Sequence, residues 1–178
     1  MNRIIPTINT ARLTLRAMRP TDFDRFAEIW ASDEVTSHIN GPLSRDAAWG
    51  SFLRNAGHWQ ITGFGQWGIE VHQSKRLVGQ VGFFYGARGY GPEFDAVPEA
   101  GWVLSPEAQG LGYAREATAA AHDWFDRVIK GALVCQIAAA HENSLRLAER
   151  LGYVALTTRE EGALRLLSRR HPPGETMR

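Results

Sequence analysis

The sequence predicts a single mixed domain of the α/β or α+β class. Its 178 residues are ordinary for one domain, and 44% hydrophobic with 10% aromatic residues supply enough apolar material for a core. Stretches that alternate polar and apolar residues are interspersed with stretches at helical spacing, and no βαβ unit repeats. We expect one domain over residues 1–178, with its core at about 10–168 and a loose tail at 171–178.

The first half of the chain should contain a strand, two helices and a β-hairpin after a loose lead-in at residues 1–10. Thr21 is expected to cap the first helix and Ser44 the second, which carries Ala48, Phe52 and Ala56 on one face. Gly57 and Gly63 mark breaks after it. The strands expected here are 12–16, 66–72 and 77–85.

The second half alternates strands and helices. Residues 86–96 hold three glycines and a proline, so we expect a loop there. The apolar run at 132–140 is typical of a strand covered on both faces. The remaining elements expected are a strand at 97–104, helices at 113–129 and 144–150, and a closing hairpin of 153–158 with 163–168.

Charge and composition exclude several classes of function. The formal net charge is +1, so there is no basic field for nucleic acid. No segment approaches the ~20 apolar residues of a membrane helix, and the N-terminus lacks the features of a signal peptide, so we expect a cytoplasmic protein with no membrane partner. The single cysteine, Cys135, reads as a buried strand thiol, and no Cys/His cluster has zinc spacing, so no metal is expected.

The most informative stretch is residues 102–117, which runs from a strand through a glycine-rich turn into a helix. Glycines let backbone approach a phosphate closely, and the first N–H groups of a helix lack partners within the helix. The helix dipole adds partial positive charge at the same point. The stretch therefore predicts an anion site, the alternative being a glycine turn that caps an ordinary helix.

Two familiar phosphate-binding motifs do not fit this turn. A P-loop ends in Gly-Lys-Ser/Thr, which is absent here. A dinucleotide-binding fingerprint needs a small residue three positions after Gly112, where the chain has Arg115, and an acid about 20 residues further on, where Cys135 stands. A nucleotide-binding α/β domain is therefore the weaker reading.

The turn resembles motif A of the GNAT (Gcn5-related N-acetyltransferase) superfamily, Gln/Arg-x-x-Gly-x-Gly/Ala, with Gln109, Gly112 and Ala114 in its slots. The resemblance implies a central, mostly antiparallel sheet with a splayed strand pair that holds acetyl-CoA, and helices on both faces. It implies coenzyme contacts from strand residues Trp102, Val103 and Leu104. It also implies contacts from the loop residues Gln109, Gly110, Leu111, Gly112, Tyr113 and Ala114.

Residues 138–153 are similar to motif B of the same superfamily. Ser144, Glu149, Arg150, Gly152 and Tyr153 match its spacing. The family usually has an asparagine three residues before the serine. This chain has His141 there and Asn143 beside the serine, so either His141 substitutes or Asn143 contacts the coenzyme. One of Asn143 and Ser144 is also expected to cap the helix, and Gly152 to end it.

Further similarities extend the resemblance over about residues 10–168 and point to the RimJ/RimL branch, which modifies ribosomal-protein N-termini. They are found at residues 12–16 with 20–22, at 99–104 and at 161–165. This branch also includes enzymes that act on small amines, so the acceptor is either a peptide N-terminus or a small-molecule amine. The acyl-chain length and the oligomeric state, including a homodimer, stay open.

Acetyl transfer to an amine needs a base, a donor for the developing oxyanion and a fate for the leaving thiolate. Glu99 is the base we favour, acting directly or through water, because a partly buried carboxylate has a raised pKa; the alternative is an exposed strand-end acid. Glu70 and Glu161 are reserves. The backbone N–H of Leu104 or Val103 is the expected oxyanion donor.

The general acid is less well defined. Many GNAT enzymes place a tyrosine four residues before the motif-B glycine, where this chain has Ala148. The resemblance leaves Ser144 as the group beside the departing sulfur. Cys135 carries no sign of thiolate activation, so direct transfer in a ternary complex is expected. A non-catalytic acyl-CoA-binding module is the alternative, because that tyrosine is absent and His141 departs from the pattern.

Overall fold

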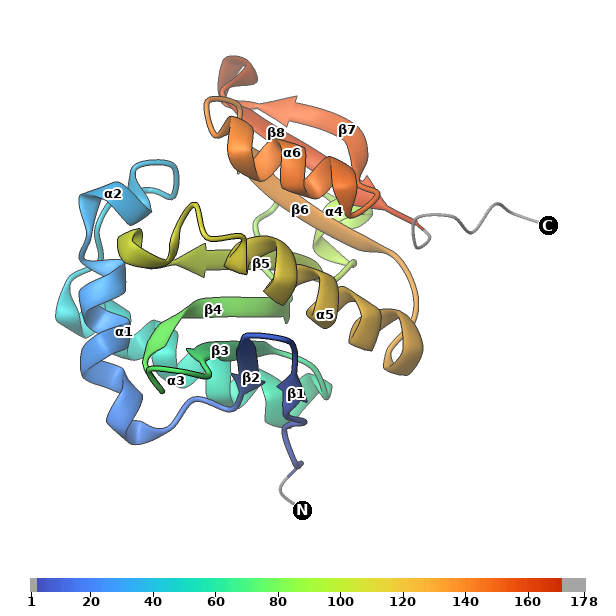
Figure 1. The fold of residues 1–178 in the computed structure, drawn as a ribbon. Helices are drawn as coiled ribbons and strands as arrows, with labels where there is room; N and C mark the ends of the chain where they lie inside the picture. Colours follow the sequence, from blue (N-terminus) through green and yellow to red (C-terminus); the bar gives the residue numbers. More distant parts are fainter. Residues whose placement is uncertain (1–2, 171–178) are drawn as a thin grey trace. The chain divides into compact units, whose positions relative to one another are not determined.

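The computed structural model describes residues 3–170 (Figure 1). The predicted tail at 171–178 lies outside them. The helices are α1 (Phe23–Trp30), α2 (Asp33–Thr36), α3 (Arg45–Thr62), α4 (Pro92–Asp95), α5 (Tyr113–Val128) and α6 (Glu142–Arg150). The strands are β1 (Ile8–Asn9), β2 (Leu13–Arg16), β3 (Gln66–Val71), β4 (Leu77–Phe84), β5 (Glu99–Leu104), β6 (Leu133–Ala138), β7 (Val154–Arg159) and β8 (Leu164–Arg169).

The strands form one open sheet in the order β1-β2-β3-β4-β5-β6-β8-β7. β5 pairs with β6 in parallel, and the pairs β1–β2, β2–β3, β3–β4, β6–β8 and β7–β8 are antiparallel. This mostly antiparallel sheet with flanking helices confirms the predicted fold class. The chain divides into a first unit, Met1–Phe83 with Gly101–Ala121, and a second unit, Phe84–Ala100 with His122–Arg178.

The N-terminal segment of the first unit is more ordered than the sequence predicts. Ile8 and Asn9 pair with β2 as β1, and the indole of Trp67 donates to the carbonyl oxygen of Pro6 at 2.8 Å. The prediction of a loose lead-in at residues 1–10 was therefore wrong for Ile8 and Asn9. A two-residue strand has too little sequence to show an alternating pattern.

The β3–β4 hairpin confirms its prediction, with Gln66 opposite Gly82 and Trp67 opposite Val81. Lys75 has a φ of 56° in the predicted turn, in the left-handed region that tight turns use. The buried Trp67 packs edge to face on Trp59 of α3, with ring centroids 4.8 Å apart. This contact ties the hairpin to the long helix.

The helix ends of the first unit are partly as expected. Ser44 caps α3 by accepting from the N–H of Ala47 at 3.2 Å. Thr21 caps nothing, since residues 20–22 form a 3₁₀ turn ahead of α1. α3 also continues through Gly57, which costs a helix only about 1 kcal/mol, and ends at Gly63, whose φ is 84°.

The apolar core of the first unit joins α1, α3 and β4. Its buried members are Phe26, Ala27, Ala48, Phe52 and Leu77. Two of the three residues expected on the inner face of α3 belong to it, but Ala56 is exposed and Trp59 is buried instead. Because α3 continues to Thr62, Trp59 rather than Ala56 supplies the buried side chain in its C-terminal half.

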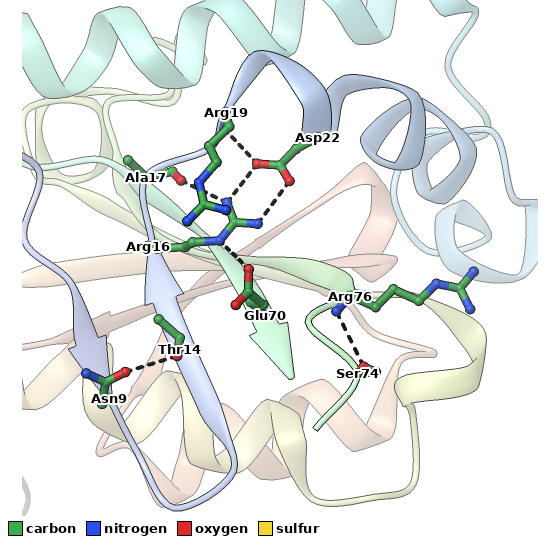
Figure 2. Close-up of polar contacts among 9 residues, drawn as sticks. All are labelled: Asn9, Thr14, Arg16, Ala17, Arg19, Asp22, Glu70, Ser74 and Arg76. Carbon is green, nitrogen blue, oxygen red and sulfur yellow. Dashed lines mark hydrogen bonds and ion pairs between the residues drawn. The ribbon is translucent and has the colours of Figure 1, made fainter. Parts of the chain in front are cut away.

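A buried arginine network holds β2, β3 and the turn before α1 together (Figure 2). The Arg16 guanidinium donates to both carboxylate oxygens of Asp22, at 2.7 and 2.9 Å, and to Glu70 at 2.6 Å. Asp22 also accepts from the N–H of Arg19 at 2.6 Å. Asp22 is therefore a structural partner of Arg16.

The second unit is built on β6, β8 and β7. The predicted closing hairpin of β7 and β8 is confirmed, and β8 lies between β6 and β7, with Val134 opposite Ser168. Its core contains Phe94, Val134 and Leu166. Arg169, which is buried, donates to both carboxylate oxygens of Asp126 at 2.8 and 2.7 Å.

Candidate acetyl-coenzyme A site

The end of β5 and the turn after it are fixed by backbone contacts within the first unit. The N–H of Ser105 donates to the carbonyl oxygen of Val78 at 2.8 Å, and a Cβ atom at Gly79 would clash with the carbonyl oxygen of Val103. The Gln109 side chain donates to the carbonyl oxygen of Leu104 at 3.2 Å. Gln109, expected at the coenzyme, thus closes the loop onto its own strand.

Two glycines give the loop its shape. Gly110 has a φ of 73° and Gly112 a φ of 79°, in the left-handed region that glycine adopts without a steric cost. Both are exposed, as is Leu111 between them, and a Cβ at Gly110 would meet nothing within 4 Å. The segment therefore offers its backbone directly to solvent.

The loop leads straight into α5, a helix of 16 residues that begins at Tyr113. The helical hydrogen bonds start with the N–H of Glu116, which donates to the carbonyl oxygen of Gly112 at 3.1 Å. The N–H groups of the first turn precede that bond and have no acceptor within the helix. Exposed backbone at the positive end of a helix dipole suits an anionic group such as a pyrophosphate.

The three strand residues expected at the coenzyme lie on β5 just before this loop. Val103 and Leu104 are buried and Trp102 is half-buried. The Leu104 carbonyl oxygen already accepts from the Gln109 side chain. That the main chain of these three residues contacts the coenzyme stays a prediction.

Glu99 lies at the start of β5, in the second unit. It is buried rather than exposed, and Arg88 binds it with two hydrogen bonds, Nε to Oε2 at 2.7 Å and Nη2 to Oε1 at 2.9 Å. Burial raises the pKa of Glu99, and the hydrogen bonds and charge of Arg88 only partly oppose it. The raised pKa expected from the sequence is confirmed.

Arg88 is itself held firmly. Its N–H donates to Asp95 at 2.8 Å, and its Nη1 and Nη2 lie 2.9 and 3.0 Å from the Gln136 amide oxygen in the orientation that satisfies that amide. A Cβ at Gly86 would collide with the Glu99 carboxylate. Residues 86–96 were predicted as a loop, but Pro92–Asp95 form the helix α4. The segment carries an arginine that sequence reasoning missed, and no pattern in it marks that residue.

The start of α6 corrects the expected capping. His141 is the N-cap residue, so neither Asn143 nor Ser144 caps the helix. The exposed Asn143 accepts from Arg146 at 2.6 Å through its side-chain oxygen. The hydroxyl of the buried Ser144 lies 3.5 Å from His141 Nε2. Gly152, with a φ of 90°, ends the helix as predicted.

The structure also defines the burial or the bonding partners of three other side chains that were considered for a chemical role. Burial raises the pKa of the Cys135 thiol, which confirms a buried and unactivated strand cysteine. Glu70, a reserve base, accepts a hydrogen bond from Arg16 at 2.6 Å and belongs to the network that joins β2, β3 and the turn before α1. Glu161, the other reserve, lies exposed in a 3₁₀ turn with a φ of 52°.

The structure therefore groups the candidate residues in two sets. Residues 101–104 and the loop 109–114 lie in the first unit, together with Arg12, whose guanidinium donates to the carbonyl oxygen of Leu111 at 2.9 Å and which sequence reasoning also missed. Glu99, Asn143 and Ser144 lie in the second unit.

Within residues 3–170, no helix combines the length and the apolarity that crossing a bilayer requires. Over the same residues, no group of three or more His, Cys, Asp or Glu side chains is placed to hold a metal ion.

Comparison with known proteins identifies the family. The chain resembles the solved structure of a protein from Bordetella pertussis assigned to the GnaT-family acetyltransferases, with 32% identity and a TM-score of 0.83 over 93% of this chain and 99% of that one. An acetyltransferase from Agrobacterium tumefaciens str. C58 is 29% identical, with a TM-score of 0.79 over 94% of this chain and 96% of that one.

A spermidine N-acetyltransferase from Vibrio cholerae, solved with CoA and spermine, shares the fold at 20% identity and a TM-score of 0.69, over 89% of this chain and 94% of that one. The family model for the acetyltransferase (GNAT) domain matches residues 12–154. This match spans most of the chain, including the glycine loop and both motifs. The chain belongs to the GNAT acetyltransferases, a family that transfers acetyl groups from acetyl-CoA.

Proposed function

We propose that this protein transfers the acetyl group of acetyl-CoA to a primary amine by direct attack within a ternary complex. The observation that carries the proposal is the loop 109–114. There two glycines in left-handed conformation expose backbone at the start of a 16-residue helix. That geometry suits the pyrophosphate of coenzyme A, and the chain belongs to a family that uses this coenzyme.

The coenzyme contacts are proposed residue by residue. The backbone of Gly110, Leu111, Gly112, Tyr113 and Ala114 would bind the pyrophosphate. Gln109 would act by holding the loop, since its amide is bonded to Leu104. The main chain of Trp102, Val103 and Leu104 would bind the pantetheine arm, and the N–H of Val103 or Leu104 would donate to the oxyanion.

Glu99 is the proposed base. Each carboxylate oxygen has two lone pairs, and Arg88 uses one on each oxygen, so both oxygens retain a lone pair that can accept a proton. The raised pKa makes Glu99 a stronger base than an ordinary glutamate. Glu99 takes one proton from the ammonium, the neutral amine attacks the thioester carbonyl, and the carbon–sulfur bond breaks. The proton that the nitrogen loses on becoming an amide goes to the leaving sulfur, so that coenzyme A is released as its thiol.

Ser144 is proposed to hydrogen-bond the departing sulfur. Its hydroxyl is buried, and His141 lies within 3.5 Å of it. A serine hydroxyl is a weak acid, so this contact stabilises the thiolate more than it protonates it. Asn143 is also proposed as a coenzyme contact. Its side-chain oxygen, which accepts from Arg146 in this structure, would then accept from the coenzyme instead.

The acceptor is proposed to be a peptide N-terminus or a small-molecule amine. Two neighbours in structure motivate the two classes: RimL, a ribosomal L7/L12 α-N-protein acetyltransferase, and the spermidine N-acetyltransferase that was solved with spermine. Their identities to this chain are 14% and 20%, so they speak for the fold and suggest which amines to test. Membership of the RimJ/RimL branch is proposed from the sequence similarities at residues 12–16, 20–22, 99–104 and 161–165.

Thermal unfolding with acetyl-CoA, with NAD and ATP as controls, tests the coenzyme assignment. Acetyl-CoA at 100 times its dissociation constant should stabilise the protein by about 2.7 kcal/mol. A shift of the midpoint with NAD or ATP and none with acetyl-CoA would refute the loop assignment. Release of coenzyme A with a panel of spermidine, spermine and short peptides then separates an enzyme from the alternative, a non-catalytic acyl-CoA-binding module.

Three broader proposals accompany this function. The whole chain, 1–178, is proposed to be one N-acetyltransferase domain that works without a metal. A cytoplasmic location is proposed from the composition of the sequence. Assembly into a homodimer is a further proposal, which size-exclusion chromatography with light scattering would test.

A further inference from the structure

The coenzyme loop is attached to the N-terminal hairpin by one arginine. Arg12 lies between β1 and β2, about 100 positions from the loop in sequence. Its Nη1 donates to the carbonyl oxygen of Leu111 at 2.9 Å, and its Nε donates to Glu116 Oε2 at 2.8 Å. A single guanidinium thus joins a loop carbonyl to the first turn of α5.

Glu116 is held for this purpose from several sides. Its Oε1 accepts from the hydroxyl of Thr10 at 2.6 Å and from the N–H of Arg12 at 2.8 Å. Burial would raise the pKa of Glu116, but the hydrogen bonds from Thr10 and Arg12 outweigh burial and lower it. The carboxylate is therefore a charged partner, fixed by both the side chain and the backbone of the hairpin.

The same guanidinium also lies against two residues of the loop. Its carbon lies 4.7 Å from the centroid of the Tyr113 ring, a cation–π distance. Its Nη2 lies 3.3 Å from the position that a Cβ at Gly112 would take. Leu111, Gly112, Tyr113 and Glu116 therefore all meet one side chain.

We propose that Arg12 is a positioning residue for coenzyme A, holding the 109–114 loop from the N-terminal hairpin in the conformation that receives the pyrophosphate. The loop has little else to fix it on its outer side, because Leu111 and both glycines are exposed. An arginine suits the role because its planar group bonds in several directions at once, whereas the lysine ammonium acts as a point charge. The inference rests on the proposed coenzyme site.

The test compares two acetyl donors. Acetyl-CoA carries the pyrophosphate, and S-acetylpantetheine ends before it, so only the first uses the loop. In Arg12→Gln we expect the KM for acetyl-CoA to rise about tenfold with kcat little changed, because binding common to ground and transition states is lost. The KM for S-acetylpantetheine should stay at the wild-type value. Arg12→Lys should recover little of the loss.

Arg45→Gln is the matched control. Arg45 is in the same unit, pairs with Asp24 at 2.5 Å and lies 4.7 Å from the centroid of the Phe23 ring, so it makes the same kinds of contact away from the loop. Its kinetic constants with both donors should match the wild type. Thermal unfolding of each variant verifies that it is folded at the assay temperature.

The outcomes distinguish the positioning role of Arg12 from the proposed acetyl-CoA-dependent function. Equal KM values for acetyl-CoA in wild type and Arg12→Gln would overturn the positioning role and leave the coenzyme site intact. Equal rises in KM for both donors would also overturn it, because a merely structural effect is not confined to the pyrophosphate. A wild-type protein that neither binds nor uses acetyl-CoA would overturn the proposed function and this inference with it.

Discussion

Two arginine–carboxylate pairs, one in each unit, have the same chemistry, yet the net pKa shifts of their acids have opposite signs. Arg16 and Asp22 are buried to similar extents, with side chains 7% and 11% exposed. In the other pair Arg88 is 26% exposed and Glu99 only 3%. The pKa of Asp22 is lowered, because hydrogen bonds from Arg16 and Arg19 outweigh its burial, whereas burial prevails at Glu99 and its pKa is raised.

The difference shows that an ion pair does not decide by itself what an acid can do. Asp22 has three hydrogen bonds from two residues and is held in its charged form, which suits a structural tie. Glu99 is the more deeply buried member of its pair and holds a proton more readily. Only the second environment suits an acid that must take up and release a proton.

Removing the carboxylate of Glu99 should give the largest effect. In Glu99→Gln we expect kcat/KM to fall about 10²–10⁴-fold, the usual contribution of a general base, while the amide retains a hydrogen bond to Arg88. Steady-state kinetics with a fixed amine measure it. Glu70→Gln is the control, because Glu70 is a buried glutamate paired with an arginine in the structural network. An undiminished rate in Glu99→Gln would exclude Glu99 as the base.

Removing the charge of Asp22 should act on stability alone. Asp22→Asn leaves Arg16 with one anionic partner, and breaking a buried pair in this way costs about 3 kcal/mol of unfolding free energy. Chemical denaturation would measure the loss, with kcat unchanged below the melting temperature. Asp123→Asn, which breaks the exposed pair with Arg127, should leave the midpoint where it is. Equal losses in the two variants would contradict a special structural role for the buried pair.

Removing Arg88 should shift the pH dependence of the reaction. Arg88 lowers the pKa of Glu99, so Arg88→Gln raises that pKa further and moves the acidic limb of the kcat/KM profile to higher pH. Arg88→Lys keeps the charge and should bring the limb back toward the wild type. The same acceptor amine is used throughout, so its own titration cancels. A limb that stays in place would mean that another group titrates.

The smallest effect concerns acid stability. The pKa of Asp22 is lower in the folded state than its ordinary value of 3.8, so its contribution is fully present above that value. It is lost as the pH falls through the folded-state pKa, because the unfolded chain then binds the additional proton. Wild type and Asp22→Asn should therefore converge in stability in acid. Parallel stability curves down to low pH would contradict the assignment.

The fold was predictable from patterns that repeat over many residues. The helices at 23–30, 45–62 and 113–128 and most of the strands lie near their expected places, because helical and strand periodicities are legible over six or more residues. The structure differs where few residues decide the conformation. Gly57 did not end α3, and the two-residue strand β1 was too short to show an alternating pattern. Thr21, expected to cap the first helix, lies instead in a 3₁₀ turn.

The site was predictable only in its local part. The glycine loop is a continuous segment, so its sequence contains its conformation. Arg12 and Arg88 act across 99 and 11 positions of sequence, and nothing near either of them indicates its partner. A raised pKa was expected for Glu99. Its pairing with Arg88 could not be predicted, because it depends on how residues 86–96 fold back toward Glu99.

The buried state of Cys135 makes this protein convenient to assay. Cys135 is the only cysteine in the chain, and burial both covers its sulfur and keeps it protonated. A chromogenic disulfide reagent, which reacts with thiolates, should therefore not react with the folded protein. Every thiol that appears during turnover would then belong to released coenzyme A, and a sudden stoichiometric increase without substrate would report unfolding instead.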